Sequence, residues 1–288
     1  MDRARAFVTD PRLPIAVSWL LLAGLLAVHE PGSALLVAIG FFAAFMSGLV
    51  GVGGAVLLIP LLLYLPPIFG FDAIAIKTVT GITIVQVTGA ALSAGLAHLN
   101  HRHADRSLFI VVGLSMAVFS FAGALVSSVV PGAVIEAIFA SMALAASAMM
   151  LILRNRTPPE IDAAPTFNRP LAFGFGAGVG FLAGMVGAGG AFILIPILLY
   201  VVRIPLRVTI GTSLWIVLAA SVTGLVGKAV TGQVDWPLAW ALLAGALPAG
   251  VFGAMLSQRT RPSRLATVLG VMIALVALRM WADVLGRI

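Results

Sequence analysis

The sequence predicts an all-α, polytopic membrane protein that contains two inverted repeats and one additional N-terminal helix. Three observations lead to this fold class. The 288 residues have a mean hydropathy of +1.15 and are 61% hydrophobic but only 9% charged, which lies outside the range of soluble domains. Several apolar runs approach the ~20 residues that span a bilayer as a helix. One glycine-rich stretch also occurs twice, which indicates a duplicated chain.

The first predicted helix covers residues 13–28 and belongs to an N-terminal segment, 1–31, that precedes the repeats. Its charge layout is that of a signal peptide, but no small-x-small cleavage site follows the apolar run, so a retained helix is the better interpretation. The net charge of +7 is attributed to cytoplasmic loops and not to nucleic-acid binding, because membrane proteins concentrate Lys and Arg in those loops.

The repeated stretch reads GLVGVGGAVLLIPLLLY at residues 48–64 and GMVGAGGAFILIPILLY at residues 184–200. Twelve of the seventeen positions are identical, at a constant offset of 136 residues. Three predicted spanning helices follow each copy, at 73–97, 107–130 and 134–153, and again at 208–228, 238–256 and 265–282. The repeats therefore occupy residues 32–153 and 171–288, and the polar, proline-containing segment 154–170 connects them.

The apolar stretch from residue 33 to residue 65 is too long for one membrane crossing and too short for two. It is either one broken spanning helix or a re-entrant hairpin. With a cytoplasmic N-terminus, the hairpin arrangement places 13 of the 17 Lys and Arg residues inside, whereas the broken spanning helix places only 8 there. The positive-inside rule therefore favours the hairpin. Each repeat then has three crossings, so the second repeat is inverted, as in many secondary transporters.

The glycines of the two stretches are the first candidates for a binding site, because they allow a tight reversal at membrane depth. Two half-helices then direct their N–H groups and positive dipole ends at the tips, which favours an anion. The alternative interpretation is that glycine only allows close helix packing. The predicted tip residues are Gly51, Gly53, Gly54, Ala55, Gly187, Gly189, Gly190 and Ala191.

The paired glycine-rich stretches with their shared proline, the GTSL at 211–214 and the VDW at 234–236 resemble the sulfite exporter TauE/SafE family of membrane permeases. The resemblance extends over nearly the whole chain beyond the first helix. It implies a secondary transporter that moves sulfite or small organosulfonates, often outward. One departure from the pattern is that the first repeat reads Ile76-Lys77-Thr78 where the second reads Gly211-Thr212-Ser213.

Polar side chains of the spanning helices complete the predicted substrate site. Lys77 and Lys228 are the only lysines, and a charge at membrane depth costs at least ~3 kcal/mol. Lys77 is therefore a candidate counter-ion for a sulfonate, the alternative for both lysines being that they snorkel to the interface. Hydroxyl and amide groups suit sulfonate oxygens, although they also bond between helices. The predicted ligands are Lys77, Thr78, Thr80, Gln86, Thr212 and Ser213, and Thr83 belongs to the same polar series.

The chain offers no signal for an enzyme, a metal or a cofactor. It contains no cysteine and no HExxH motif, which argues against an intramembrane enzyme. The histidines of HLNHRHAD at 98–105 are assigned to a solvated loop. The acidic residues fall in loops or near helix ends, so no mid-membrane carboxylate is available for a proton relay or a Na⁺ site.

The predicted function is that of a multi-pass inner-membrane permease that exports a small anion, sulfite or an organosulfonate, with its N-terminus in the cytoplasm. A channel-like pore or a permease for another small anion is the alternative. The expected partners are the anionic substrate and the lipid bilayer, without nucleic acid, and homo-oligomerisation is left open.

The topology can be tested with single cysteines in this naturally cysteine-free chain. Replacement of Arg102, Arg156, Arg203 or Arg261 by Cys should give four proteins that an impermeant thiol reagent fails to label from outside, because all four positions are predicted to be cytoplasmic. External labelling at positions 102 and 156, but not at 261, would contradict both the hairpin and the inverted repeat.

Overall fold

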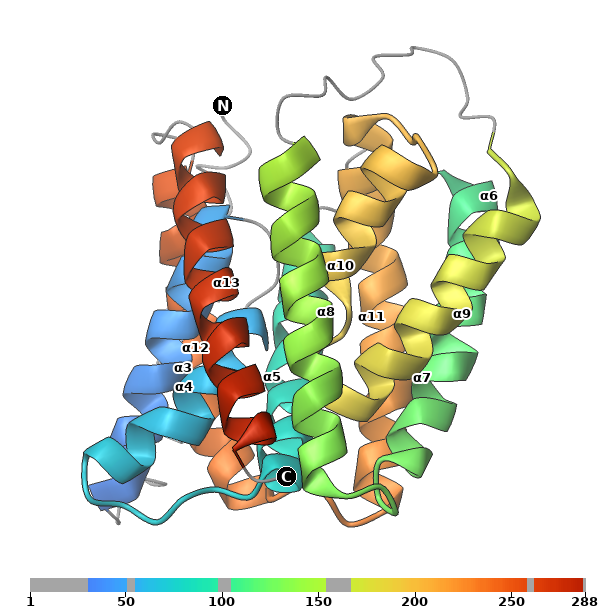
Figure 1. Cartoon of the computed structure of the whole chain (residues 1–288). Helices are drawn as coiled ribbons and strands as arrows, with labels where there is room; N and C mark the ends of the chain where they lie inside the picture. Colours follow the sequence, from blue (N-terminus) through green and yellow to red (C-terminus); the bar gives the residue numbers. More distant parts are fainter. Residues whose placement is uncertain (1–30, 51–54, 98–104, 154–166, 258–261, 287–288) are drawn as a thin grey trace.

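The computed structural model describes residues 31–50, 55–97, 105–153, 167–257 and 262–286, and in these ranges the chain consists of helices and their connections (Figure 1). Two predicted features, the N-terminal helix at 13–28 and the first glycine tip at 51–54, lie outside the described residues.

Each glycine-rich stretch is followed by long helices, as predicted. In the first repeat the helices are α3 (Pro31–Val50), α4 (Ala55–Ile68), α5 (Ile76–Ala97), α6 (Arg106–Leu108), η1 (Phe109–Gly113), α7 (Leu114–Val126) and α8 (Gly132–Leu153). In the second they are α9 (Arg169–Val186), α10 (Ala191–Pro196), η2 (Ile197–Val201), α11 (Leu206–Val230), α12 (Trp236–Ser257) and α13 (Pro262–Leu285). The segments η1 and η2 are π-helical turns, and α6, η1 and α7 form one continuous helix.

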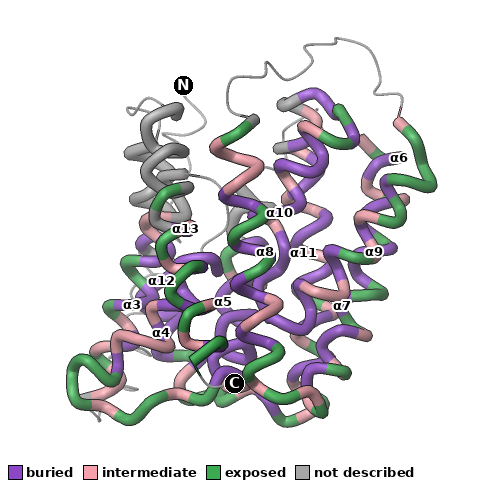
Figure 2. The backbone as a smooth tube through the Cα atoms, viewed as in Figure 1, coloured by how far each residue is buried: buried purple, intermediate pink, exposed green. Residues whose placement is uncertain are grey.

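The outer surface of the bundle suits a bilayer. Four helices in the described ranges are long and apolar enough to cross a membrane: Arg106–Val126, Gly132–Ile152, Arg169–Val186 and Gly211–Val230. Buried segments gather where the helices face one another, and exposed segments follow their outer sides (Figure 2). Large apolar side chains stand on these outer sides, among them Leu114, Val118, Trp240, Leu275 and Leu278. Soluble monomers rarely expose so much apolar surface. The predicted all-α membrane fold is therefore confirmed.

The main helix contacts join one repeat to the other. Helix α3 packs on α12, α7 on α9 and α11, α5 on α11, and α8 on α13. Glycines allow the closest crossings, as small residues do in membrane bundles. A Cβ atom on Gly245 would overlap the carbonyl oxygen of Val37, and one on Gly184 would overlap the carbonyl oxygen of Ser120. The two repeats consequently share one core and do not form separate domains.

The helices that follow the two glycine-rich turns lead to opposite edges of the bundle. The connection after α4, residues 69–75, runs along the lower edge in Figure 1, whereas the connection between η2 and α11 lies at the upper edge. Helix α9 starts at that upper edge, descends toward the interior, and α10 with η2 leads back up. The turn between α9 and α10 therefore lies deep in the bundle, where it contacts α5 and α11.

Candidate functional site

The break between α9 and α10 is the best-defined feature of the candidate site. Gly187, Gly189 and Gly190 have φ values of 72°, 64° and 72°, in the left-handed region that favours glycine. The N–H groups of Gly187 and Ala188 both donate to the carbonyl oxygen of Ala183, at 2.8 and 3.2 Å, which closes the end of α9. The glycines are thus required by backbone conformation and not only by packing.

The break lies against α5. A Cβ atom on Gly187 would overlap the carbonyl oxygen of Thr80, and one on Gly189 would press on the side chains of Val87 and Val217. Thr80 and Val87 stand between the second turn and the middle of a 22-residue helix, which is about 33 Å long at 1.5 Å per residue. The non-helical backbone consequently lies at membrane depth, where it is tolerated only if protein or a wet cavity surrounds it.

Two polar atoms on α5 are buried without a hydrogen-bond partner: Oγ1 of Thr83 and Oε1 of Gln86. The two side chains are 0% and 1% exposed. Such atoms are rare, because an unpaired buried polar group costs about 1–3 kcal/mol. Thr83 lies on the same stripe of the helix as Thr80 and Val87, by its spacing of three and four residues, and this stripe packs against the break. The Thr83 hydroxyl can therefore donate a hydrogen bond to a ligand, whereas the Gln86 oxygen can only accept one.

Lys228 lies near the end of α11 and is fully buried, at 0% exposure. Its Nζ atom donates to four uncharged oxygens, those of Thr80 Oγ1 (3.0 Å), Ser127 Oγ (2.8 Å), the Met185 carbonyl (2.9 Å) and Gln233 Oε1 (2.9 Å). The snorkelling interpretation is wrong for this lysine, because its ammonium points into the protein.

Lys77 lies close to this cluster. Its Nζ donates to the carbonyl oxygen of Ser128 at 2.6 Å, and its own carbonyl accepts from the hydroxyl of Thr80 at 2.8 Å. Thr80 thereby links the two lysines through hydrogen bonds. The only two lysines of the sequence therefore place their positive charges on the same side of the break. Lys77 itself is half-buried and bound to protein oxygen.

Two other predicted ligands lie at the opposite end of the bundle. Thr212 is buried, and its Oγ1 accepts the backbone N–H of Asp105 at 2.9 Å. It borders a cavity of about 250 Å³, whose lining is Asp105, Arg106, Phe109, Thr212 and Trp215. Ser213 is also buried. Because Asp105 precedes the α6–α7 helix and Ser128 follows it, Thr212 and Lys77 are a whole helix length apart. The structure does not bring them together.

The remaining predicted residues divide into described and undescribed ones. Gly51, Gly53 and Gly54 lie outside the described residues. Ala55 and Ala191 start α4 and α10, and Thr78 is half-buried at the start of α5. The structure therefore brings Thr80 of α5 against Gly187, and Val87, the neighbour of Gln86, against Gly189. Gly190 meets Met116, Ala183 and Val179 instead, and Thr212 and Ser213 lie outside this region.

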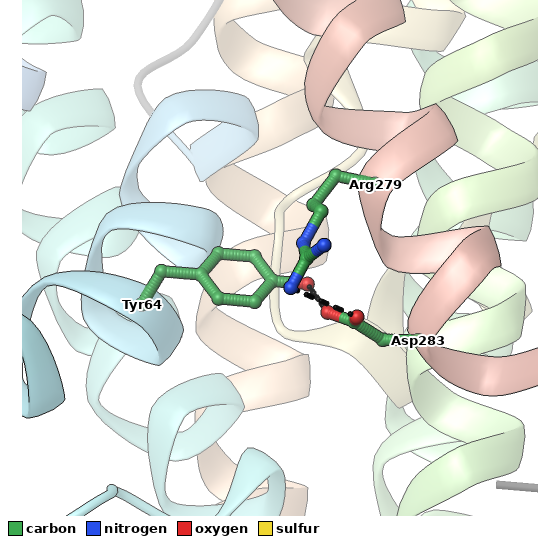
Figure 3. A network of polar contacts seen from close by, with 3 residues as sticks. All are labelled: Tyr64, Arg279 and Asp283. Atoms are coloured by element: carbon green, nitrogen blue, oxygen red, sulfur yellow. Dashed lines mark hydrogen bonds and ion pairs between the residues drawn. The ribbon is translucent and has the colours of Figure 1, made fainter. Parts of the chain in front are cut away.

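Tyr64 takes part in a separate polar network near the end of α4 (Figure 3). Its hydroxyl donates to Oδ2 of Asp283 at 2.7 Å, and Oδ1 of the same carboxylate lies 3.3 Å from Nη2 of Arg279. Arg279 and Asp283 are four residues apart on α13. The Tyr64 hydroxyl therefore joins α4 to α13.

The partners that surround Lys228 could not be identified from the sequence. Ser127 and Gln233 lie in the short connections after α7 and α11, and Met185 contributes only a backbone carbonyl. The isolated lysine in an apolar helix was the available signal, because a buried ammonium requires acceptors for its three N–H groups. Which connections supply those acceptors depends on the packing of the two repeats.

Comparisons with known proteins agree with this architecture. Residues 36–280 match the family described as sulfite exporter TauE/SafE. A probable membrane transporter protein of Xylella fastidiosa (strain 9a5c) is 29% identical over 259 residues, which cover 86% of this chain and 95% of that protein. The probable membrane transporter protein YunE of Bacillus subtilis (strain 168) is 24% identical over 259 residues, covering 84% and 94%. No solved structure matches the chain.

The family and the names of these relatives are those of membrane transporters and not of enzymes. The match covers both glycine-rich stretches and ends within α13. Together with the helical membrane fold, it shows that this chain is a membrane transporter of the sulfite exporter TauE/SafE family.

Proposed function

We propose that the protein is a permease that exports a small sulfur oxyanion, sulfite or a small organosulfonate, across the inner membrane. The substrate binds at Thr83 of α5, beside the break that separates α9 from α10. The observation that carries this proposal is the buried, unpartnered hydroxyl of Thr83 on α5, which can donate to an oxyanion oxygen and lies beside backbone that glycine keeps free of side chains.

The charges near the break favour an anion. The four oxygens that accept from Lys228 are uncharged, and the nearby Lys77 is bound by a carbonyl oxygen. Neither ammonium is neutralised by these contacts, so the region has a positive potential. A low-dielectric surrounding strengthens that potential. Hydroxyl and amide groups supply the hydrogen bonds that oxyanion oxygens require.

An inverted relation between the repeats is part of the proposal. In support of it, the helix contacts remain the same when each helix is exchanged for its counterpart: α3 with α12 corresponds to α9 with α7. The connections after the two glycine-rich segments also lie at opposite edges of the bundle (Figure 1).

The direction of transport follows from the membrane potential if no cation is coupled to the anion. An inside-negative potential expels anions with ~2.3 kcal/mol per charge for each 100 mV, which corresponds to roughly 50-fold accumulation outside for a monoanion. In proteoliposomes preloaded with ³⁵S-sulfite or a labelled sulfonate, an inside-negative potassium diffusion potential should therefore accelerate efflux without any proton or sodium gradient.

The matched control is the same preparation with the potential collapsed, in which efflux should slow. Uphill uptake that requires a proton or sodium gradient would contradict uncoupled export. Flux of chloride or nitrate in place of every sulfur oxyanion would identify a permease for another anion, and rates without saturation would identify a channel-like pore.

Deletion of the Thr83 hydroxyl separates an effect on substrate binding from an effect on folding stability. Thr83→Val removes a buried atom that has no partner in the protein, so the thermal unfolding midpoint should stay unchanged or rise. Transport should fall by about tenfold or more, because a hydrogen bond to the substrate worth ~1.4 kcal/mol corresponds to a factor of ten. Both quantities are measured on the same purified protein.

Thr223→Val is the matched control. The Thr223 hydroxyl lies on α11 and donates to the carbonyl oxygen of Ala117 on α7 at 2.7 Å. Its loss should lower the unfolding midpoint and leave the flux per folded molecule near that of the parent. Full flux in Thr83→Val would remove Thr83 from the proposed site.

A further inference from the structure

Lys228 holds a charge in the protein interior that the proposed transport reaction does not contact. The residue is 0% exposed, and charges inside membrane proteins are costly and usually have a task. Its ammonium has three N–H donors and four oxygens at 2.8–3.0 Å. The donors are saturated by the protein, so none remains to bind a substrate directly.

The four oxygens come from four separate parts of the chain. Thr80 belongs to α5, Ser127 ends α7, Met185 lies in the last turn of α9, and Gln233 lies between α11 and α12. The bond to Met185 satisfies a carbonyl at a helix C-terminus, where a cation is favourable. Gly187, two residues further on, is the first residue of the break. The ammonium therefore fixes the end of α9 relative to α5.

The charge also lies close to the unpartnered atoms of α5. Thr80 Oγ1 is 3.0 Å from Nζ, and Thr83 and Gln86 follow one and two turns later on the same helix. That spacing places the ammonium about 8–12 Å from a ligand bound there. At an effective dielectric constant of ~20, a unit charge at this distance changes the affinity for a monoanion roughly 10- to 30-fold.

We propose that Lys228 is a positioning residue that sets the charge preference of the transport site: it holds the α9 end against α5 and supplies, without touching the substrate, the fixed positive charge that selects anions. The inference rests on the proposed site between α5 and the break. It does not depend on which anion is transported.

The test compares an anion with an uncharged molecule of the same shape. Methanesulfonate and methanesulfonamide are offered as competitors of labelled substrate to the parent protein and to Lys228→Met. The variant should lose roughly 10- to 30-fold in affinity for methanesulfonate and keep its affinity for the sulfonamide. Lys228→Arg keeps the charge and should restore much of the preference, although its planar guanidinium fits the four oxygens differently.

Two outcomes would overturn the inference. Equal weakening of both competitors in Lys228→Met would mean that the lysine serves packing alone. A larger loss of anion preference in Lys77→Met would assign the selecting charge to Lys77, which is half-buried and therefore expected to have the smaller effect.

A second variant covers the case in which Lys228→Met does not fold. Ser127→Ala removes one of the four oxygens but keeps the charge and its contact with Thr80 on α5, so the preference for methanesulfonate over methanesulfonamide should persist; its disappearance would contradict a role of the charge. The proposed function is judged separately, by whether the parent prefers methanesulfonate to nitrate and acetate.

Discussion

The structure depends on one constraint. Wherever a helix is interrupted inside the membrane, its free backbone N–H and C=O groups and any buried charge need hydrogen-bond partners. No water is available there to bind a free N–H or C=O group. At the end of α9 the Ala183 carbonyl accepts two N–H groups, and the Met185 carbonyl accepts from Lys228. The same ammonium is itself satisfied by α5 and by two connections. The interruption of the helix, which would otherwise be costly in free energy, is thus stabilised by contacts among four segments of the chain.

Close packing between the repeats makes this junction rigid. Glycines bring α9 against α7 and α12 against α3 so closely that a methyl group would not fit. Interhelical hydrogen bonds add to this packing: Ser120 and Thr223 link α7 and α11 through the carbonyls of Ala220 and Ala117. In contrast, α4 is joined to α13 by the Tyr64 hydroxyl, next to an ion pair whose arginine is 68% exposed and which contributes little.

Much of the fold could be predicted from the sequence because it depends on local signals. The lengths of the apolar runs predicted the long helices. The duplicated glycines and Pro196 predicted the break in the second repeat. Three-dimensional packing decided what local signals could not. Lys77 and Thr212 occupy comparable places in the two repeats, yet they lie at opposite ends of the α6–α7 helix. Lys228 was identified as unusual, but its acceptors come from connections far away in the sequence, which no spacing rule could bring together.

If substrate binds at α5 beside the α9–α10 break, a single cysteine at Ala188 should detect it. Ala188 lies within the break and is 3% exposed, and the parent chain has no cysteine. N-ethylmaleimide is expected to label Ala188→Cys slowly. Saturating methanesulfonate should slow this labelling further, by about tenfold, whereas acetamide at the same concentration should leave the rate unchanged. An unchanged labelling rate with methanesulfonate, in a variant that still transports, would place the substrate elsewhere.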